Sequence, residues 1–538
     1  MTTQLEPTAI AEDVLSSQTM NGAEQLVHTL IGNGVDVCFA NPGTSEMHFV
    51  AALDSIPGMR CVLGLFEGVV TGAADGYYRM AGKSAATLLH LGPGLANGLA
   101  GLHNAKKAGS GIVNIVGDHA TGHLKLDAPL TSDIAGLATP MSHWVRSTQN
   151  ANDMERDGTE AVAAANGRPG KIATLILPAD TAWSQVATPR TSFSTLTREL
   201  AEPIDAAKLE AAARAARHGE STLLLLGAGA VRGDALDWAG RIAAATGCAV
   251  MSEFYIARAE RGAGRVSAPR LPYAVDPSLA LLKRYDRIIL VGARPPVAFF
   301  AYPGKPGVLS APGCELIELA GTGHDHEQVL RALCEEVGGL KLLPARVVNR
   351  QVPEVGEGAI DGPGIGRVLA RLIPENGIVV DESLTTGRGF DGLTASAAPH
   401  DWLTGMGGAI GFALPVAVGA AIASPGRRVL ALEGDGSGMY SLQSLWTMVR
   451  ESLDVTVLVF ANRAYRILRG EFENVGAGAP GPRAADMLSL ERPELDWVAL
   501  ASGMGMPAAR VDTLSALNAQ LARAVADSGP SLIEVILP

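Results

Sequence analysis

The stretch VLALEGDGS, residues 429–437, starts as an apolar run and breaks sharply at the Gly-Asp-Gly of residues 434–436. The apolar part predicts a buried strand, and a second apolar run at residues 455–460 predicts the next parallel strand, which ends just before Asn462. A helix with a polar start is expected between them, over residues 441–450. This pattern predicts a strand–turn–helix–strand unit of a parallel α/β sheet.

Asp435 and Asn462 follow the two predicted strands. Because α/β sheets bind ligands at the carboxyl ends of their strands, we expect the two side chains to lie together. A carboxylate and an amide oxygen suit Mg²⁺ that is shared with a phosphate group. Gly434 and Gly436 let the backbone approach that phosphate, and the N-terminus of the helix that follows favours its charge. Taken alone, the Gly-Asp-Gly motif is also typical of a plain tight turn.

Length and composition bound the class of protein. A chain of 538 residues is too long for one core and indicates about three domains. The net charge of −12 without a basic stripe argues against nucleic-acid binding. Five cysteines without metal spacing indicate free thiols and a reducing cytoplasm, and no segment is typical of a signal peptide or a membrane span. We therefore expect a cytoplasmic enzyme without membrane partners, and a flexible tail at residues 1–20.

Strand and helix patterns alternate along the chain, which predicts doubly wound parallel sheets of the α/β class. The expected domains are residues 21–185, 204–340 and 362–538, joined by linkers rich in small and polar residues. In the second domain, the glycines of residues 227–233 are one residue off a dinucleotide fingerprint. A turn that binds no nucleotide is the favoured interpretation there.

Two residues of the first domain are chemically informative. Glu67 sits at a strand–helix junction before small residues, where it is either a helix N-terminal acid or a functional carboxylate. His90 ends a predicted strand, and a lone histidine in such a place is often structural. His119 and His123, after the predicted strand at residues 111–117, are read as loop residues.

The interval of 27 residues from Asp435 to Asn462 resembles the signature of the thiamine-diphosphate-dependent enzymes. In that family the Asp and the Asn bind Mg²⁺ together with a backbone carbonyl, which is that of Ala464 here. Residues 66–77 are similar to the family's pyrimidine-binding segment. The resemblance implies that Glu67 shares a proton with the cofactor's ring nitrogen N1′, so that the 4′-amino group can deprotonate C2.

Further segments of the third domain resemble the same family. Thr385 and Thr386 match its hydroxyl-rich diphosphate loop, and residues 407–415 match the segment that holds the cofactor bent. The resemblance implies that the Gly408 carbonyl accepts the 4′-amino group and that Ile410 is the apolar wedge between the rings. Gly434, Gly436 and Ser437 are the corresponding diphosphate contacts.

The segments that are expected to bind the substrate resemble those of benzoylformate decarboxylases in part. Residues 41–44 match their Asn-Pro-Gly-Ser stretch, so Thr44 is expected to hold a substrate carboxylate, and His90 matches a histidine of that group. Their second active-site histidine has no counterpart in residues 293–304. After Asn462 a helix carrying Leu468 and Glu471 is expected over the substrate pocket.

Glu471 departs from the family pattern, in which a large aromatic residue stands at this position. We predict that Glu471 lines the pocket and disfavours an anionic substrate tail. The alternative is a solvated helix charge paired with Arg466 or Arg469.

The resemblance implies a thiamine-diphosphate- and Mg²⁺-dependent decarboxylase or carboligase of 2-oxo acids, of the acetolactate synthase type. It would act through a C2 ylid and an enamine that is protonated or added to a second carbonyl. The alternatives are a benzoylformate decarboxylase-like enzyme or another thiamine-dependent C–C lyase or hydrolase, and a catalytically silent regulatory protein. Homodimers or homotetramers are implied, with active sites between subunits.

Overall fold

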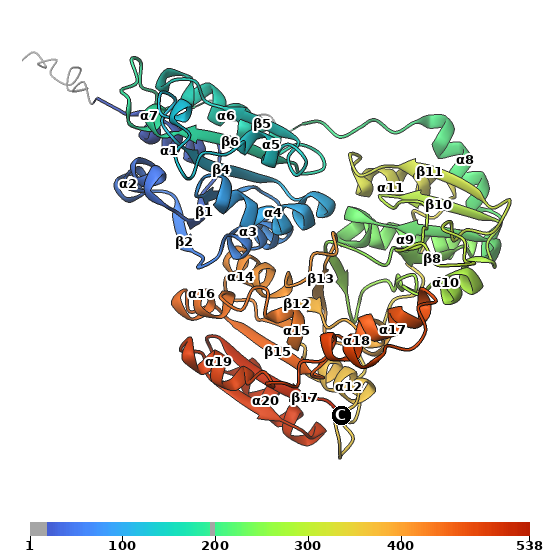
Figure 1. Cartoon of the computed structure of the whole chain (residues 1–538). Helices are drawn as coiled ribbons and strands as arrows, with labels where there is room; N and C mark the ends of the chain where they lie inside the picture. The colour runs from blue at the N-terminus through green and yellow to red at the C-terminus, as the bar shows by residue number, and fades with distance from the viewer. Residues whose placement is uncertain (1–18, 194–198) are drawn as a thin grey trace, which may run out of the picture.

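The computed structural model describes residues 19–193 and 199–538, and its strands form three separate sheets (Figure 1). Most of the tail expected at residues 1–20 lies outside the described residues. The blue-to-teal first domain and the green-to-yellow central domain lie side by side, and the orange-to-red third domain lies beneath both in this view.

The first sheet has six parallel strands in the order β2-β1-β3-β4-β6-β5. Its strands alternate their side chains between two apolar cores, so both faces of the sheet are buried. The strands are β1 (Val37–Asn41), β2 (Arg60–Leu63), β3 (Ala85–Leu89), β4 (Ile112–Asp118), β5 (Trp144–Ser147) and β6 (Ile172–Pro178). The helices are α1 (Gly22–Gly32), α2 (Met47–Ser55), α3 (Glu67–Ala81), α4 (Leu91–Ala108), α5 (Ile134–Ala138), α6 (Met154–Ala165) and α7 (Ala179–Trp183).

The central sheet has four parallel strands in the order β11-β10-β7-β8. These strands are β7 (Thr222–Leu226), β8 (Ala249–Ser252), β10 (Arg287–Val291) and β11 (Glu315–Ala320). The helices around them are α8 (Ala206–Ala216), α9 (Gly233–Thr246), α10 (Val275–Leu282) and α11 (His326–Glu336). The chain reverses its winding between β7 and β10, which is the place where such sheets form a crevice.

The third sheet has seven strands in the order β16-β17-β15-β14-β12-β13-β9, and all but β9 are parallel. The edge strand β9 (Ala259–Arg261) comes from the sequence range of the central domain, so it ties the two domains together. The other strands are β12 (Gly377–Glu382), β13 (His400–Thr404), β14 (Val429–Gly434), β15 (Val455–Ala461), β16 (Ala508–Val511) and β17 (Ser531–Ile536). The helices are α12 (Gly362–Leu372), α13 (Phe390–Leu393), α14 (Ala413–Ala423), α15 (Asp435–Gly438), α16 (Ser444–Arg450), α17 (Arg466–Asn474), α18 (Pro482–Met487), α19 (Trp497–Gly503) and α20 (Leu514–Ala526).

Helices α3 and α14 join the first and third domains through one continuous apolar core. Their backbones approach so closely that a Cβ at position 419 would lie 1.8 Å from the Ala73 carbonyl oxygen. A Cβ at position 76 would lie 2.1 Å from the Val416 carbonyl oxygen. Glycine is therefore required at both positions, and one long face of α3 is buried within the chain itself.

The predicted doubly wound α/β class is confirmed, and so are the strands that carry the decisive motif. The helix expected at residues 441–450 begins later, at Ser444, because residues 439–443 form turns. In the part of the chain that the structure describes, no helix is long and apolar enough to cross a membrane.

Candidate active site

Asp435 and Asn462 follow β14 and β15 at the same edge of the third sheet, where Gly434 is in register with Phe460. The buried carboxylate of Asp435 accepts hydrogen bonds from the backbone N–H of Arg463 at 2.6 Å and of Gly436 at 2.9 Å. Asn462 Oδ1 accepts from the N–H of Ala464 at 3.0 Å. The structure therefore brings the two predicted ligands together, with the loop at residues 462–464 held against Asp435.

This donor set suits a divalent cation. Burial raises the pKa of Asp435 to about 6 because the carboxylate loses water, and the backbone hydrogen bonds and the charge of Arg463 offset only part of this effect. A bound Mg²⁺ would stabilise the charged form and accept oxygen ligands from Asp435, Asn462 and the Ala464 carbonyl. Within residues 19–193 and 199–538, no group of three His, Cys, Asp or Glu side chains that could hold a metal occurs.

The predicted diphosphate residues surround this edge. Gly434 and Gly436 flank Asp435, and a Cβ at position 436 would lie 2.6 Å from the Tyr465 ring. Thr385 and Thr386 follow β12 in a turn closed by the bond from the Thr386 N–H to the Ser383 carbonyl at 3.0 Å. The hydroxyl of Ser437 donates a hydrogen bond to Glu433.

Glu382 and Glu433 form a buried carboxyl pair that the sequence analysis overlooked. They are in register on β12 and β14 and are almost fully buried. Burial raises the pKa of Glu382 to about 8, and burial followed by the charge of Glu382 raises the pKa of Glu433. The pair therefore holds a proton at neutral pH. The sequence feature that could have revealed this pair is Glu433, a glutamate within the apolar run of residues 429–433.

Glu382 also positions the loop that carries the predicted wedge. Its carboxyl group accepts from the N–H of Gly411 and of Ala413, both at 2.8 Å. Between these anchors and β13, Gly408 has a φ of 78°, and the side chain of Ile410 is 38% exposed. An isoleucine held on a rigid loop with its side chain uncovered fits a wedge that packs against a ligand.

Glu67 is the first residue of α3, as predicted from the strand–helix junction. Its Oε2 accepts a hydrogen bond from Asn97 Nδ2 at 3.0 Å. A Cβ at position 94 would lie 3.1 Å from Glu67 Oε1, so the glycine there leaves the carboxylate uncrowded. Asn97 was not predicted, and it orients the carboxylate from the neighbouring helix α4.

His90 immediately precedes α4, and its ring pairs with Glu46, another residue that the sequence analysis missed. His90 Nδ1 lies 2.8 Å from Glu46 Oε2. Burial raises the pKa of Glu46, although the charge and hydrogen bond of His90 act in the opposite direction. A Cβ at position 43 would lie 2.3 Å from the His90 ring, which explains the glycine before the exposed Thr44. Glu46 therefore orients the ring through one of its two nitrogens.

His119 and His123 follow β4, and their ring centroids are 5.4 Å apart. Nε2 of His119 is buried without a hydrogen-bond partner in the described structure. They occupy the loop predicted for them, on the same edge of the first sheet as His90.

The predicted residues fall into two groups that lie apart within one chain. Helix α4 has 18 residues and is therefore about 27 Å long. Glu67 and His90 lie toward its N-terminal half, whereas the loop at residues 407–409 bonds to His103 and Asn104 near its C-terminal end. Within the described ranges, no hydrogen bond or ion pair links Glu67 or His90 to Asp435 or Asn462.

Helix α17 carries Leu468 and Glu471. Leu468 is 45% exposed. Among the residues described, neither Arg466 nor Arg469 forms an ion pair with Glu471, and Arg466 instead bonds the carbonyl of Pro538 at 3.1 Å. The carboxylate of Glu471 lies beside Tyr302 of the central domain. The pairing with Arg466 or Arg469 is therefore not formed within the described residues, and the place of Glu471 in the substrate pocket stays a prediction.

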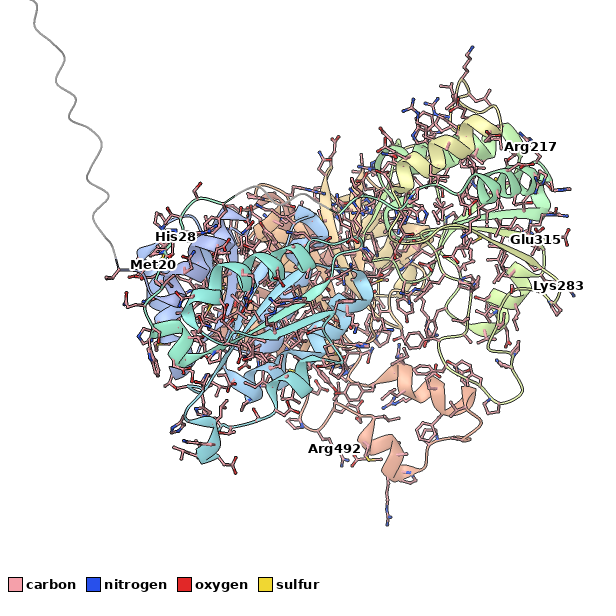
Figure 2. The ribbon with its side chains drawn as sticks, turned by 90° about the horizontal axis from the view of Figure 1, so that it is seen from above. Met20, His28, Arg217, Lys283, Glu315 and Arg492 are labelled. Atoms are coloured by element: carbon pink, nitrogen blue, oxygen red, sulfur yellow. The ribbon has the colours of Figure 1, made fainter. Side chains whose placement is uncertain are left out.

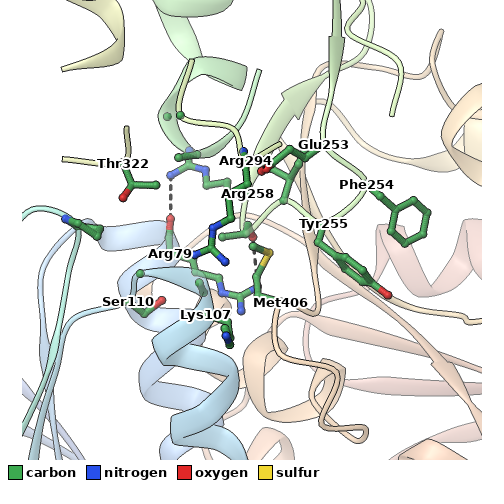
Figure 3. A pocket seen from close by; sticks show the side chains of 18 of the residues that line it. Arg79, Lys107, Ser110, Glu253, Phe254, Tyr255, Arg258, Arg294, Thr322 and Met406 are labelled. Carbon is green, nitrogen blue, oxygen red and sulfur yellow. Dashed lines mark hydrogen bonds between the residues drawn. The ribbon is translucent and has the colours of Figure 1, made fainter. Parts of the chain in front are cut away.

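A cavity of about 760 Å³ lies between the first and central domains (Figure 3). Arg79 and Lys107 line it from the first domain, Arg258 and Arg294 line it from the central domain, and Phe254 and Tyr255 stand at one side. Glu253 reaches into it and accepts from the N–H of Arg294 at 2.5 Å.

The glycine turn after β7 borders the same cavity. A Cβ at position 227 would lie 2.7 Å from Glu253 Oε2, and one at position 229 would lie 2.8 Å from His326 Nδ1. Glu253 and His326 thus occupy the space beside the turn, where a bound diphosphate would meet a carboxylate. This arrangement favours the interpretation of a turn without a nucleotide.

Glu253→Gln is expected to flatten the pH dependence of stability. Burial raises the pKa of Glu253 from its ordinary 4.5 to about 7, so the folded chain keeps a proton that the unfolded chain releases. Stability should therefore fall as the pH rises from about 4.5 through about 7, by up to about 3 kcal/mol, and then stay level. Calorimetric Tm values of both proteins between pH 5 and 8 test this, since parallel curves would contradict it.

Comparison with known proteins decides the family. Residues 20–141 match the family described as thiamine pyrophosphate enzyme, N-terminal TPP binding domain, and residues 390–535 match its C-terminal TPP binding domain. The chain is 49% identical to the Mycobacterium tuberculosis protein named "Putative acetolactate synthase large subunit IlvX", over 96% of this chain and 99% of that protein. The chain belongs to the thiamine pyrophosphate enzyme family.

Two further relatives of this thiamine pyrophosphate enzyme support the same family assignment. It is 30% identical to benzoylformate decarboxylase of Pseudomonas aeruginosa, over 94% of this chain and 96% of that protein. It also resembles the structure of a Rhodococcus jostii thiamine diphosphate-dependent 4-hydroxybenzoylformate decarboxylase, with a TM-score of 0.82, 25% identity and 96% and 99% of the two chains covered. It is therefore a thiamine-diphosphate-dependent enzyme of the acetolactate synthase and benzoylformate decarboxylase type, and it acts on small molecules.

Proposed function

We propose that this enzyme is a Mg²⁺-dependent decarboxylase or carboligase of 2-oxo acids. The observation that carries the proposal is the buried Asp435 beside Asn462 at adjacent strand ends, in a chain that also keeps Glu67 uncrowded at the start of α3. A silent regulatory protein would have no need of these three groups together. When bound, thiamine diphosphate supplies a carbon nucleophile and takes up the electrons that carbon dioxide leaves behind.

The chain's own residues have distinct tasks in this proposal. Asp435, Asn462 and the Ala464 carbonyl hold Mg²⁺ and with it the diphosphate. Ile410 would pack against the bound cofactor as an apolar wedge, and the Gly408 carbonyl would accept a hydrogen bond from its amino group. Glu67 holds a proton at the ring nitrogen N1′ and is itself oriented by Asn97.

We further propose that each active site is shared between two copies of the chain, in a homodimer or homotetramer. Glu67 lies away from Asp435 in one chain, and α14 already covers the long face of α3. Apolar side chains near both groups are uncovered, with Leu65 47% exposed and Ile410 38% exposed. A second copy that covers them would bring the two groups together.

The decisive experiment is carbon dioxide release from a panel of 2-oxo acids by the enzyme loaded with thiamine diphosphate and Mg²⁺. We expect release from at least one member and none after removal of Mg²⁺. Absence of release across the panel, with the cofactor shown to be bound, would overturn the proposal. Analysis of the product then separates an aldehyde, formed by protonation, from a carboligation product.

The His90–Glu46 pair favours release of an aldehyde, which requires a proton. The pair places an oriented acid beside the residues that are expected to bind the substrate. His90→Ala is expected to lower kcat by roughly 10²–10⁴-fold, and Glu46→Gln by less. Deuterium exchange at C2 of the bound cofactor should stay unchanged in both variants, since Glu67 acts on that step. An unchanged kcat in His90→Ala would remove His90 from the proposed site.

A further inference from the structure

The loop at residues 462–464 contains a residue in an unusual backbone conformation. Arg463 has a φ of 55°, which lies in the left-handed region that residues with a Cβ rarely adopt. It stands between Asn462 and Ala464, which supply two of the proposed Mg²⁺ ligands. A left-handed residue that is not glycine persists only where the surrounding structure holds it, and such residues cluster at functional sites.

The left-handed turn folds the loop over the proposed metal site. In this conformation the N–H of Arg463 donates to Asp435 Oδ2 at 2.6 Å. The N–H of Ala464 donates to Asn462 Oδ1 at 3.0 Å. An extended φ at Arg463 would turn the chain that follows in another direction and carry the Ala464 carbonyl away from Asp435. The conformation of this one residue therefore decides whether the two ligands on either side of it face the same point.

The side chain of Arg463 fastens the loop to the segment that follows β17. Its Nη2 donates to the carbonyl oxygen of Leu537 at 3.0 Å. Leu537 is itself held in place, because its N–H donates to the Ala461 carbonyl at 3.0 Å and its side chain is buried. The guanidinium thus ties the loop to β15 and β17, which are neighbours in the sheet.

Backbone hydrogen bonds hold the same loop from a third direction. The carbonyl of Arg463 accepts from the N–H of Leu490 at 2.8 Å, and the N–H of Tyr465 donates to the carbonyl of Leu488 at 3.0 Å. This segment leads to Arg492, which Figure 2 labels beside helices of the third domain. Because these bonds use main-chain atoms, they remain when the side chain of Arg463 is replaced. A substitution there therefore removes the guanidinium anchor and leaves the other supports of the loop.

We propose that Arg463 is a positioning residue of the metal site. Its guanidinium, anchored on Leu537, keeps the backbone in the left-handed turn that presents Asn462 and Ala464 to Mg²⁺. This inference rests on the proposed function. The anchor offsets the steric cost that a residue with a Cβ bears in this conformation. Glu494 lies 3.9 Å from Nη1, which is beyond hydrogen-bond distance, so the carbonyl and not a carboxylate is the anchor.

Calorimetric titration of Mg²⁺ in the presence of thiamine diphosphate tests the inference. Arg463→Ala loses the anchor and keeps the Cβ, so its Kd for Mg²⁺ should rise by roughly 10–100-fold, as for the loss of an outer-shell partner of a metal. Arg463→Gly takes up the left-handed turn without steric cost, so its Kd should rise less. Arg463→Lys keeps a donor and should retain part of the affinity. Arg466→Ala is the matched control, because it removes a bond to the Pro538 carbonyl at 3.1 Å from outside the turn, and its Kd should be unchanged.

A kinetic measurement separates positioning from a general loss of structure. In Arg463→Ala the Mg²⁺ concentration for half-maximal activity should rise with the Kd, whereas kcat at saturating Mg²⁺ and the Tm of the metal-free protein should change little. Should Arg463→Ala not fold, the same titration of Arg463→Lys and Arg463→Gly against the wild type decides.

The inference and the proposed function can fail separately. If the wild type decarboxylates no 2-oxo acid yet the Kd values follow the expected order, the proposed function fails and the role of Arg463 stands. Equal Kd values for the wild type and the folded Arg463 variants, an equal loss in Arg466→Ala, or no binding of Mg²⁺ by the wild type would overturn the inference.

Discussion

Glu67→Gln is expected to slow deuterium exchange at C2 of bound thiamine diphosphate by roughly 10²–10⁴-fold, the usual contribution of one general acid or base. Glutamine keeps the size of the side chain and can still bond to Asn97, but it cannot take up or release the proton at N1′. Cofactor affinity should therefore change little, and kcat should fall with the exchange rate. The measurements are proton NMR of the exchange after acid quench and calorimetric titration of the cofactor.

Two further variants control for a merely structural effect. Asn97→Ala removes the bond that orients Glu67 at 3.0 Å, so it should slow exchange less than Glu67→Gln does. Glu67→Asp keeps the acid and should recover part of the rate. Exchange that proceeds at the wild-type rate in Glu67→Gln would show that the carboxylate is only a helix N-terminal acid.

Asp435→Ala is expected to abolish Mg²⁺-dependent binding of thiamine diphosphate and the activity with it. Asp435 is the single carboxylate in the proposed metal site, so its loss should exceed the roughly 10–100-fold that the loss of an outer-shell partner of a metal costs. Calorimetric Kd values for the cofactor, with and without Mg²⁺, are the measurement. As a control for folding, Asp435→Asn should have the same Tm as the metal-free wild type. Cofactor binding by Asp435→Ala that still responds to Mg²⁺ would place the metal elsewhere.

Mixing the two inactive proteins tests where the active site lies. If each site takes Glu67 from one chain and Asp435 from another, a mixed pair of Glu67→Gln and Asp435→Ala chains contains one intact site. Refolding the two together should then recover about a quarter of the wild-type activity. If each active site were built within one chain, the mixture would recover no activity.

The sequence by itself determined the fold class and the enzyme family. Apolar runs such as residues 222–226 and 455–460 lie in strands of parallel sheets that are covered on both faces, where continuous hydrophobicity is required. The ends of the strands before Asp435 and Asn462 could be predicted because Gly434 and Asn462 interrupt the apolar runs there. Glu67 was found in the same way, at the start of a helix of small residues.

Only the tertiary structure decided which residues face one another across the domains. Glu46 precedes a short helix and shows no pattern of its own, and its link to His90 arises because β1 and β3 are neighbours in the sheet. Glu382 and Glu433 meet through the register of two strands that lie about 50 residues apart. Glu471 of the third domain influences the pKa of Tyr302 in the central domain, although the two residues are far apart in the sequence. Local propensity records how each segment folds, whereas such contacts depend on strand order and domain packing, which are spread over the whole chain.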